Sequence, residues 1–242
     1  MKKESVIYYL SHDDLKDENI LFNYIYPNEN NNYYITDDFS KDFYILLAYY
    51  GFITTSITFE KKFYLLPEIQ FEYALLDFEN LHISKKVMKL INQNNYEFSI
   101  NTNLPLVLEN LEKYHKKNWL TNHYKELITS LKDYAHPSID FQLVSVELFD
   151  KRTNELIAGE IGYRINSTYT SLTGFALKDK KYNNWGKLQL VLLGVYLENN
   201  GFSFWNLGHP YMQYKFDLGA TTYSRKDFLK RWLPQLGLYI TC

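Results

Sequence analysis

The sequence predicts an α+β protein with a mixed, mostly antiparallel sheet flanked by helices. Apolar and polar residues alternate in three successive segments, 141–149, 156–165 and 169–177, and polar turns separate them. This alternation is typical of half-buried strands, so the three segments predict an antiparallel meander. The strongly apolar stretch at 185–199 ends shortly before Gly201. Helices commonly end at such a glycine, and we expect this one to cover the sheet.

Further elements are expected on both sides of this region. A buried strand at 202–207 and a last helix at 226–232 follow the long helix. In the first half, Ser40 and Ser84 are typical helix N-caps, and Pro67 separates two strand-like segments. The elements expected there are a helix from Ser40 to about Tyr50, strands at 52–66 and 71–78, a short helix after Ser84, a strand at 96–100, and helices at 105–117 and 121–134. The patterns divide the chain into a small α/β N-terminal domain, 1–76, and a larger domain, 77–242.

Composition bounds the class of protein. With 242 residues, 46% of them hydrophobic, the chain can bury one substantial core or one core with a small satellite domain. The formal net charge of −2 argues against a protein that coats DNA or RNA nonspecifically, since phosphate-driven affinity needs clustered cations. A small contact with RNA through a local cluster of cations is still an alternative.

Location and cofactors follow from a few residues. The single cysteine, Cys242, rules out an internal disulfide framework and fits a reducing, cytoplasmic compartment. The charge-free stretch 43–59 contains Gly51 and a Thr-rich run, so it indicates a buried helix and a strand rather than a membrane span. The histidines show no metal-ligand spacing. We expect no metal, no cofactor and no membrane contact, and a monomeric chain.

The expected element order is that of the GNAT acyltransferase fold: three strands, a helix, a strand and a further helix. In that fold the central strands splay apart around the acyl donor, although topology alone is an analogy. Acyl-CoA enzymes carry a turn of the form Arg/Gln-x-x-Gly-x-Gly/Ala, whose amides hold a pyrophosphate. Here the segment at 182–188 has one glycine and no leading Arg or Gln. An acyl-CoA-dependent N-acyltransferase is therefore the alternative, and a different acyl donor is favoured.

Short motifs in a fixed order carry a family resemblance. They are Leu-His-Ile-Ser-Lys-Lys at 81–86, Trp119, Val-Ser-Val-Glu at 144–147, Glu-Leu-Ile-Ala-Gly at 155–159, and Leu-Gly-Ala at 218–220 with Arg225, Phe228 and Leu229 downstream. Over most of its length the chain resembles the leucyl/phenylalanyl-tRNA–protein transferase family. The resemblance implies an aminoacyltransferase that moves leucine or phenylalanine from aminoacyl-tRNA to the N-terminal amine of an acceptor protein, which marks that protein for degradation.

Two departures from the family pattern bear on mechanism. The family's Gly-Glu-Ser-Met segment corresponds to a stretch in which Leu172 replaces the acidic residue. Its Asp-Cys-Gln segment corresponds to Asn206-Leu207-Gly208. The usual acceptors, N-terminal Arg and Lys, need acidic groups nearby, so acidic acceptor termini, paired with Lys215 or Arg225, remain an alternative.

Three residues near the expected strand 202–207 are candidates for catalysis. The Asn206 amide could orient the amine or donate to a developing oxyanion, or merely close a turn. His209 has a side chain suited to proton shuttling, or it starts a helix before Pro210. Gln213 could replace the family's missing glutamine.

The remaining candidates concern substrate and tRNA. For substrate binding they are Trp119, Thr173, Phe175, Tyr214 and Lys215, with burial in the core or on an exposed helix face as the alternatives. For tRNA they are Lys178, Lys180, Lys181 and Lys187 as phosphate contacts and Trp185 as a stacking surface for the terminal adenosine. A non-catalytic binding module on the same fold is the third hypothesis.

Overall fold

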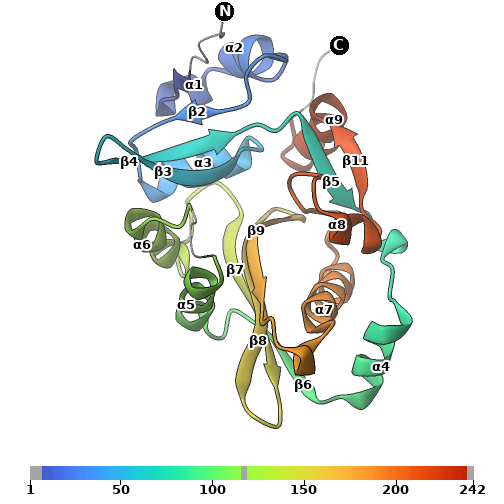
Figure 1. Ribbon diagram of the computed structural model, residues 1–242. Helices are drawn as coiled ribbons and strands as arrows, with labels where there is room; N and C mark the ends of the chain where they lie inside the picture. The colour runs from blue at the N-terminus through green and yellow to red at the C-terminus, as the bar shows by residue number, and fades with distance from the viewer. Residues whose placement is uncertain (1–6, 116–118, 239–242) are drawn as a thin grey trace, which may run out of the picture.

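A seven-stranded sheet forms the centre of the computed structural model, which describes residues 7–115 and 119–238 (Figure 1). One neighbouring pair, β9 with β10, is parallel, and every other pair recorded in this sheet is antiparallel. The predicted α+β class with a mostly antiparallel sheet is therefore confirmed. The strand order is β11 (Thr221–Ser224), β5 (Glu72–Leu76), β10 (Phe204–Asn206), β9 (Thr168–Ala176), β8 (Glu155–Ile165), β7 (Phe141–Asp150) and β6 (Tyr96–Ile100).

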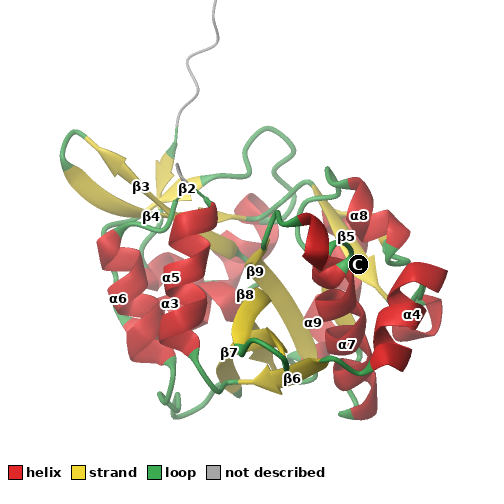
Figure 2. Ribbon diagram, turned by 60° about the horizontal axis from the view of Figure 1, so that its bottom comes forward, coloured by secondary structure: helices red, strands yellow, loops and turns green. Residues whose placement is uncertain are grey.

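Helices cover both faces of this sheet (Figure 2). On one face lie α5 (Leu104–Tyr114) and α6 (Asn122–Leu131); on the other lies α7 (Trp185–Asn199), packed against α4 (Lys85–Gln93). The long apolar segment at 185–199 is thus the predicted helix. Two short helical turns, η2 (Phe78–Asn80) and η3 (Lys180–Tyr182), connect these elements, and α8 (Gln213–Asp217) and α9 (Arg225–Gln235) follow β10. In the part of the chain that the structure describes, every helix is too short or too polar to span a membrane.

The N-terminal segment packs along one end of the sheet and adds two small sheets. Its helices are α1 (His12–Lys16), α2 (Glu18–Ile20), the π-helical η1 (Leu21–Ile25) and α3 (Lys41–Tyr49). Its strands are β1 (Tyr8–Tyr9) paired with β2 (Tyr34–Ile35), and β3 (Ile53–Phe59) paired with β4 (Lys62–Glu68). One hydrophobic core runs from this segment through α5 and α6 to α9.

The single strand expected at 52–66 is wrong, because the chain turns back at Glu60 and Lys61. Both residues have positive φ, 49° and 64°, as a two-residue hairpin turn of type I′ requires. Such turns favour Asn and Gly, and neither residue is present here. The hairpin therefore left no turn signature in the sequence.

The predicted domain boundary at 76/77 stays a prediction, and the sheet itself crosses this position. Strand β5 ends at Leu76, yet it lies between β10 and β11 in the central sheet. Tyr73 of β5 stacks on Phe228 of α9 with ring centroids 3.8 Å apart. Residues on the two sides of the expected boundary thus share one sheet and one core.

Arg225 joins the N-terminal segment to the C-terminal helix. Its side chain is 6% exposed, and its guanidinium donates to the backbone carbonyl of Gln70 at 3.0 Å, of Ile69 at 2.7 Å and of Asn31 at 3.2 Å. A further bond reaches the carbonyl of Asn28. Backbone carbonyls engage these donors, so Arg225 is not placed to pair with an acidic acceptor terminus. That pairing was one of the alternatives drawn from the sequence.

Replacing Arg225 with Leu should destabilise the fold strongly. The substitution removes the donors and leaves several buried carbonyl oxygens unpaired, each costing about 1–3 kcal/mol. We expect the free energy of unfolding, measured by urea denaturation, to fall by at least ~3 kcal/mol. Lys230→Ala, on the same helix with a side chain 55% exposed, should change it by less than ~1 kcal/mol. Equal losses in both variants would contradict this role for Arg225.

Candidate active site

Strands β9 and β10 pair over a short distance and then separate. The parallel pairing joins Phe204 to Thr168, Trp205 to Tyr169 and Asn206 to Thr170. β10 also pairs with β5, Trp205 with Leu76 and Asn206 with Leu75. From Leu207 the chain stays with β5 alone, because Leu207 N donates to Ala74 O at 2.9 Å and Ala74 N donates to Gly208 O at 2.7 Å. Beyond Thr170, β9 therefore keeps β8 on one edge, and no described strand pairs with its other edge. We call this opening the fork.

The turn that follows β10 borders the fork and is held by two side chains. Oδ1 of Asn206 accepts a hydrogen bond from Gly208 N at 2.9 Å. Nζ of Lys215, from α8, donates to the carbonyl oxygens of Leu207 at 2.5 Å and His209 at 2.6 Å. Gly208 has a φ of +72°, a conformation that favours glycine. Asn206 thus closes a turn, which was one of its two predicted roles, and Lys215 is buried behind that turn.

A buried carboxylate lies near the fork on the α7 side. Glu160 of β8 is 3% exposed and accepts from the hydroxyls of Tyr169 at 2.9 Å and Ser171 at 2.7 Å and from Nε2 of Gln189 at 3.3 Å. Burial raises the pKa of Glu160, and these hydrogen bonds together with the charge of Lys215 oppose that rise. Sequence reasoning missed Glu160, although a charged residue in the middle of a strand, with uncharged neighbours on both sides, was the available signal.

A second carboxylate meets His209. Nε2 of His209 donates to Oε2 of Glu68, at the end of β4, over 2.9 Å. The other oxygen of Glu68 accepts from Nδ2 of Asn32 at 2.5 Å. Burial, and then the charge of Glu68, raises the pKa of Tyr33 to about 12. Glu68 was also missed, because it falls between the strands expected at 52–66 and 71–78, whereas β4 continues to Glu68.

The free edge of β9 meets residues from the α5 face. Nε2 of His115 donates to the carbonyl of Gly174 at 3.0 Å and lies 3.4 Å from the hydroxyl of Thr173. Thr173 lies on the part of β9 beyond the pairing with β10, and its substrate-binding role stays a prediction. Phe175 is 4% exposed and packs in the core, which was its alternative role. Trp119 packs edge-on against Tyr124, with centroids 5.0 Å apart, and its binding role stays a prediction.

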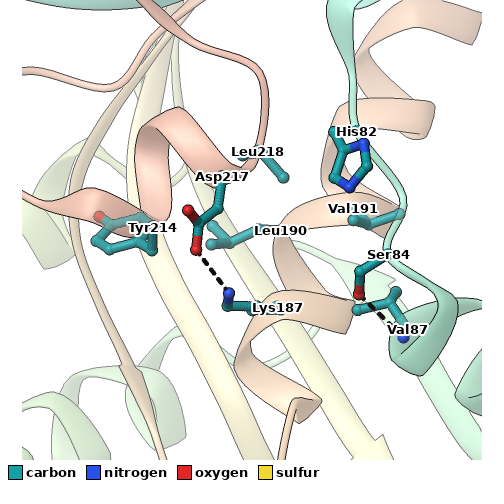
Figure 3. A pocket seen from close by; sticks show the side chains of 9 residues that line it. All are labelled: His82, Ser84, Val87, Lys187, Leu190, Val191, Tyr214, Asp217 and Leu218. Atoms are coloured by element: carbon teal, nitrogen blue, oxygen red, sulfur yellow. Dashed lines mark hydrogen bonds and ion pairs between the residues drawn. The ribbon is translucent and has the colours of Figure 1, made fainter.

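A pocket of about 270 Å³ lies between α4, α7 and α8 (Figure 3). Lys187 of α7 and Asp217 of α8 form an ion pair of 2.9 Å at its edge, and Lys187 lowers the pKa of Asp217. Burial, and then the charge of Glu160, raises the pKa of Tyr214 to about 12. Tyr214 lines the pocket and the next residue, Lys215, bonds the turn beside the fork, so α8 connects the two. The lining residues are His82, Ser84, Val87, Lys187, Leu190, Val191, Tyr214, Asp217 and Leu218.

The candidates for tRNA contact lie at and before the start of α7. Lys178 sits over the ring of Tyr114 at 4.9 Å, and Lys181 lies 3.6 Å from Glu155. Lys180 is exposed in the same turn. Trp185 is 4% exposed, so the face needed to stack on an adenosine is covered by its neighbours.

The structure brings some of the predicted residues together and separates others. Asn206, His209, Tyr214 and Lys215 surround the turn beside the fork. Gln213, whose amide bonds Asp217 at 3.2 Å, sits with Lys187 near the pocket. The catalytic and binding roles of all these residues stay predictions.

The buried ammonium of Lys215 should give the fold a measurable pH dependence. Burial lowers its pKa to about 8, whereas an unfolded chain titrates near about 10.4. Below pH 8 the folded state bears the cost of burying the charge. As the pH rises from about 8 towards 10.4 the folded state loses the proton first, so stability rises relative to a Lys215→Met variant. Urea denaturation across this window should show the difference changing by on the order of 3 kcal/mol. A difference that is constant with pH would contradict the burial of a charged group.

Comparisons with known proteins identify the region around the fork. The model of the leucyl/phenylalanyl-tRNA protein transferase family matches residues 75–232. The leucyl/phenylalanyl-tRNA–protein transferase of Pseudomonas entomophila is 28% identical over 165 residues, which are 65% of this chain and 66% of that protein. That of Shewanella piezotolerans is 25% identical over 155 residues, 62% of this chain and 59% of that protein. The matched parts thus span less than two thirds of each relative's length.

Solved structures with a similar arrangement belong to other proteins. FemX matches with a TM-score of 0.47 and 10% identity over 92% of this chain and 80% of its own. L-PGS from Bacillus licheniformis matches with a TM-score of 0.46 and 11% identity over 79% of this chain and 65% of its own. The family model, by contrast, covers more than half of the sequence and includes both strands of the fork. This chain therefore belongs to the leucyl/phenylalanyl-tRNA protein transferase family.

Proposed function

We propose that this chain is an aminoacyl-tRNA–protein transferase, which moves leucine or phenylalanine from tRNA to the N-terminal amine of an acceptor protein. The observation that carries the proposal is the fork, because it lies inside the region that matches the family model and leaves one edge of β9 open. The product would carry a new N-terminal residue that marks it for degradation. We propose a monomeric, cytoplasmic enzyme that needs no cofactor.

The reaction proposed at the fork is aminolysis of an ester. The acceptor nitrogen attacks the carbonyl carbon of the aminoacyl ester, the bond from that carbon to the ribose oxygen breaks, and a proton moves from nitrogen to that oxygen. An α-amino group with a pKa of about 7.7–8.0 is partly neutral near pH 7, so positioning supplies much of the rate. Backbone N–H groups on the free edge of β9 are suitable donors to the developing oxyanion.

The surroundings of the fork suggest where each substrate lies. The tRNA end is proposed to approach along the turn of Lys178, Lys180 and Lys181 toward the pocket at Lys187, since these are cations before and within the first turn of α7. The acceptor would then enter from the side of the Asn206 turn.

The family's acidic residue in the strand segment is Leu172 here, and Leu172 packs against the core. The two cations considered as partners for acidic acceptors, Lys215 and Arg225, donate to backbone carbonyls instead. The choice between basic and acidic acceptor termini is therefore left to experiment.

A transfer assay tests the proposed reaction. The purified chain is incubated with radiolabelled Leu-tRNA or Phe-tRNA and with peptides that begin with Arg, Lys, Asp or Glu. We expect label on one acceptor class, and a peptide with an acetylated N-terminus should stay unlabelled. If no peptide is labelled while a family member from Pseudomonas entomophila works in parallel, the proposal is wrong. Thermal shifts with CoA thioesters in the same preparation would then point to the acyl-CoA alternative.

Substitutions at Asn206 test whether its turn matters for transfer. Asn206→Ala removes the acceptor of the Gly208 N–H bond, so the turn beside the fork loses its fixed shape, and we expect kcat/KM to fall about 10- to 100-fold. Asn206→Asp keeps an oxygen in the same place and restores the family's residue, so it should retain most of the activity. Equal activity in the alanine variant and the unchanged chain would remove Asn206 from the mechanism.

A further inference from the structure

The side chains of His209 and Glu68 form a pair whose parts have different exposure. Glu68 is 5% exposed as a whole residue, whereas the His209 side chain is 31% exposed. The imidazole thus reaches solvent while the carboxylate behind it is covered. His209 stacks on Tyr211 with centroids 4.7 Å apart and planes inclined by 13°, so one face of the ring is covered too.

The hydrogen bond between the pair selects the tautomer of the histidine. A carboxylate can only accept, so Nε2 carries the proton that bonds to Glu68. The neutral ring then has its lone pair on Nδ1. Among residues 7–115 and 119–238, no hydrogen-bond partner is recorded for Nδ1. A histidine with one nitrogen held by a buried carboxylate and the other free to accept a proton is the arrangement of a general base.

The pair is also held rigidly at the edge of the fork. Asn32 occupies the second oxygen of Glu68 at 2.5 Å, and strand β4 is bridged to the chain at Tyr33. The carbonyl of His209 accepts from Lys215 at 2.6 Å, and the turn from Asn206 to His209 begins at the last paired residue of β10. Glu68 and Tyr211 contact the imidazole itself. The further titratable groups nearby are Tyr33, which is bridged to Glu68, and Lys215, which bonds the carbonyl of His209.

We propose that His209 is the proton acceptor for the incoming amine and that Glu68 is its positioning residue. This inference rests on the proposed transferase function and deepens it. Nδ1 of His209 takes a proton from the acceptor nitrogen as that nitrogen bonds to the carbonyl carbon. The same proton then passes to the ribose oxygen as its bond to carbon breaks, so the histidine ends neutral. Glu68 holds the ring in the required tautomer and balances the transient imidazolium charge. Glu68 precedes the region matched by the family model, which starts at residue 75.

Kinetics of the full chain with saturating aminoacyl-tRNA and the best acceptor peptide test this role. We expect His209→Ala to lower kcat about 100-fold with little change in KM for tRNA, since a general base contributes about 10²–10⁴-fold. Added imidazole should restore part of the kcat of His209→Ala and should not restore Asn206→Ala. The matched control is His12→Gln on α1, where the ring lies 5.8 Å from that of Phe43, and it should behave as the unchanged chain.

Variants of Glu68 separate a positioning role from a merely structural one. Glu68→Gln keeps an acceptor for Nε2 but removes the charge, so kcat should fall about 10-fold or more. The acidic limb of the pH–rate profile should move to lower pH, because the imidazolium loses its neighbouring anion. Glu68→Asp, which retains the charge, should recover part of the rate. Circular dichroism and melting temperature identify any variant that fails to fold, and His209→Gln then replaces His209→Ala.

The outcomes distinguish this inference from the function on which it rests. If the unchanged chain transfers no amino acid, the proposed function fails first. If the unchanged chain is active and a folded His209→Ala variant keeps its kcat within about twofold, or if imidazole has no effect on a slowed variant, His209 is not the base. An unmoved pH profile in Glu68→Gln would overturn the role of Glu68.

Discussion

The ammonium group of Lys215 holds the turn on which the candidate site depends. It donates to two carbonyl oxygens, those of Leu207 and His209, at the place where the chain leaves β9 and continues beside β5. A chain leaving a sheet would normally expose such carbonyls to water or to another strand. Here a buried cation satisfies them, and the charge of Glu160 partly opposes the lowering of the Lys215 pKa by burial. The opening between the two strands is thus held by polar contacts as well as by apolar packing.

Much of the architecture could be predicted from periodicity. The meander and α7 were visible because alternation and a long apolar run are strong local signals, and their order also indicated the class of fold. The hairpin at Glu60 and Lys61 could not be predicted, because its turn uses residues without a turn preference. Strand β11 was missed because it is only four residues long, Thr221–Ser224. Such a short strand forms only because it pairs with β5, which is far away in the sequence.

The candidate site was predictable only in part, for a related reason. Asn206, His209 and Lys215 lie close together in the sequence, so a single motif could indicate them. Glu68 and Glu160 come from other strands, and only the pairing of β10 with β5 and β9 brings them near the turn. Strand alternation put Thr173 and Phe175 on the same face, and it could not tell that Phe175 packs in the core. Local spacing predicts which residues share a face of a helix or strand. Identifying the residues that meet from different strands requires the tertiary structure.

The contact of Arg225 with the N-terminal segment links the region that the family model matches to the residues before it. The guanidinium bonds to the carbonyls of Asn31, Ile69 and Gln70, and none of these three residues lies in the region that the family model matches. Carbonyl oxygens are present whatever the side chain, so the arginine is anchored by the course of the backbone rather than by particular side chains. A fragment cut to residues 75–232 would expose an unpaired cation and one face of α9. The segment before the matched region therefore supplies the backbone acceptors that hold the start of α9 in place.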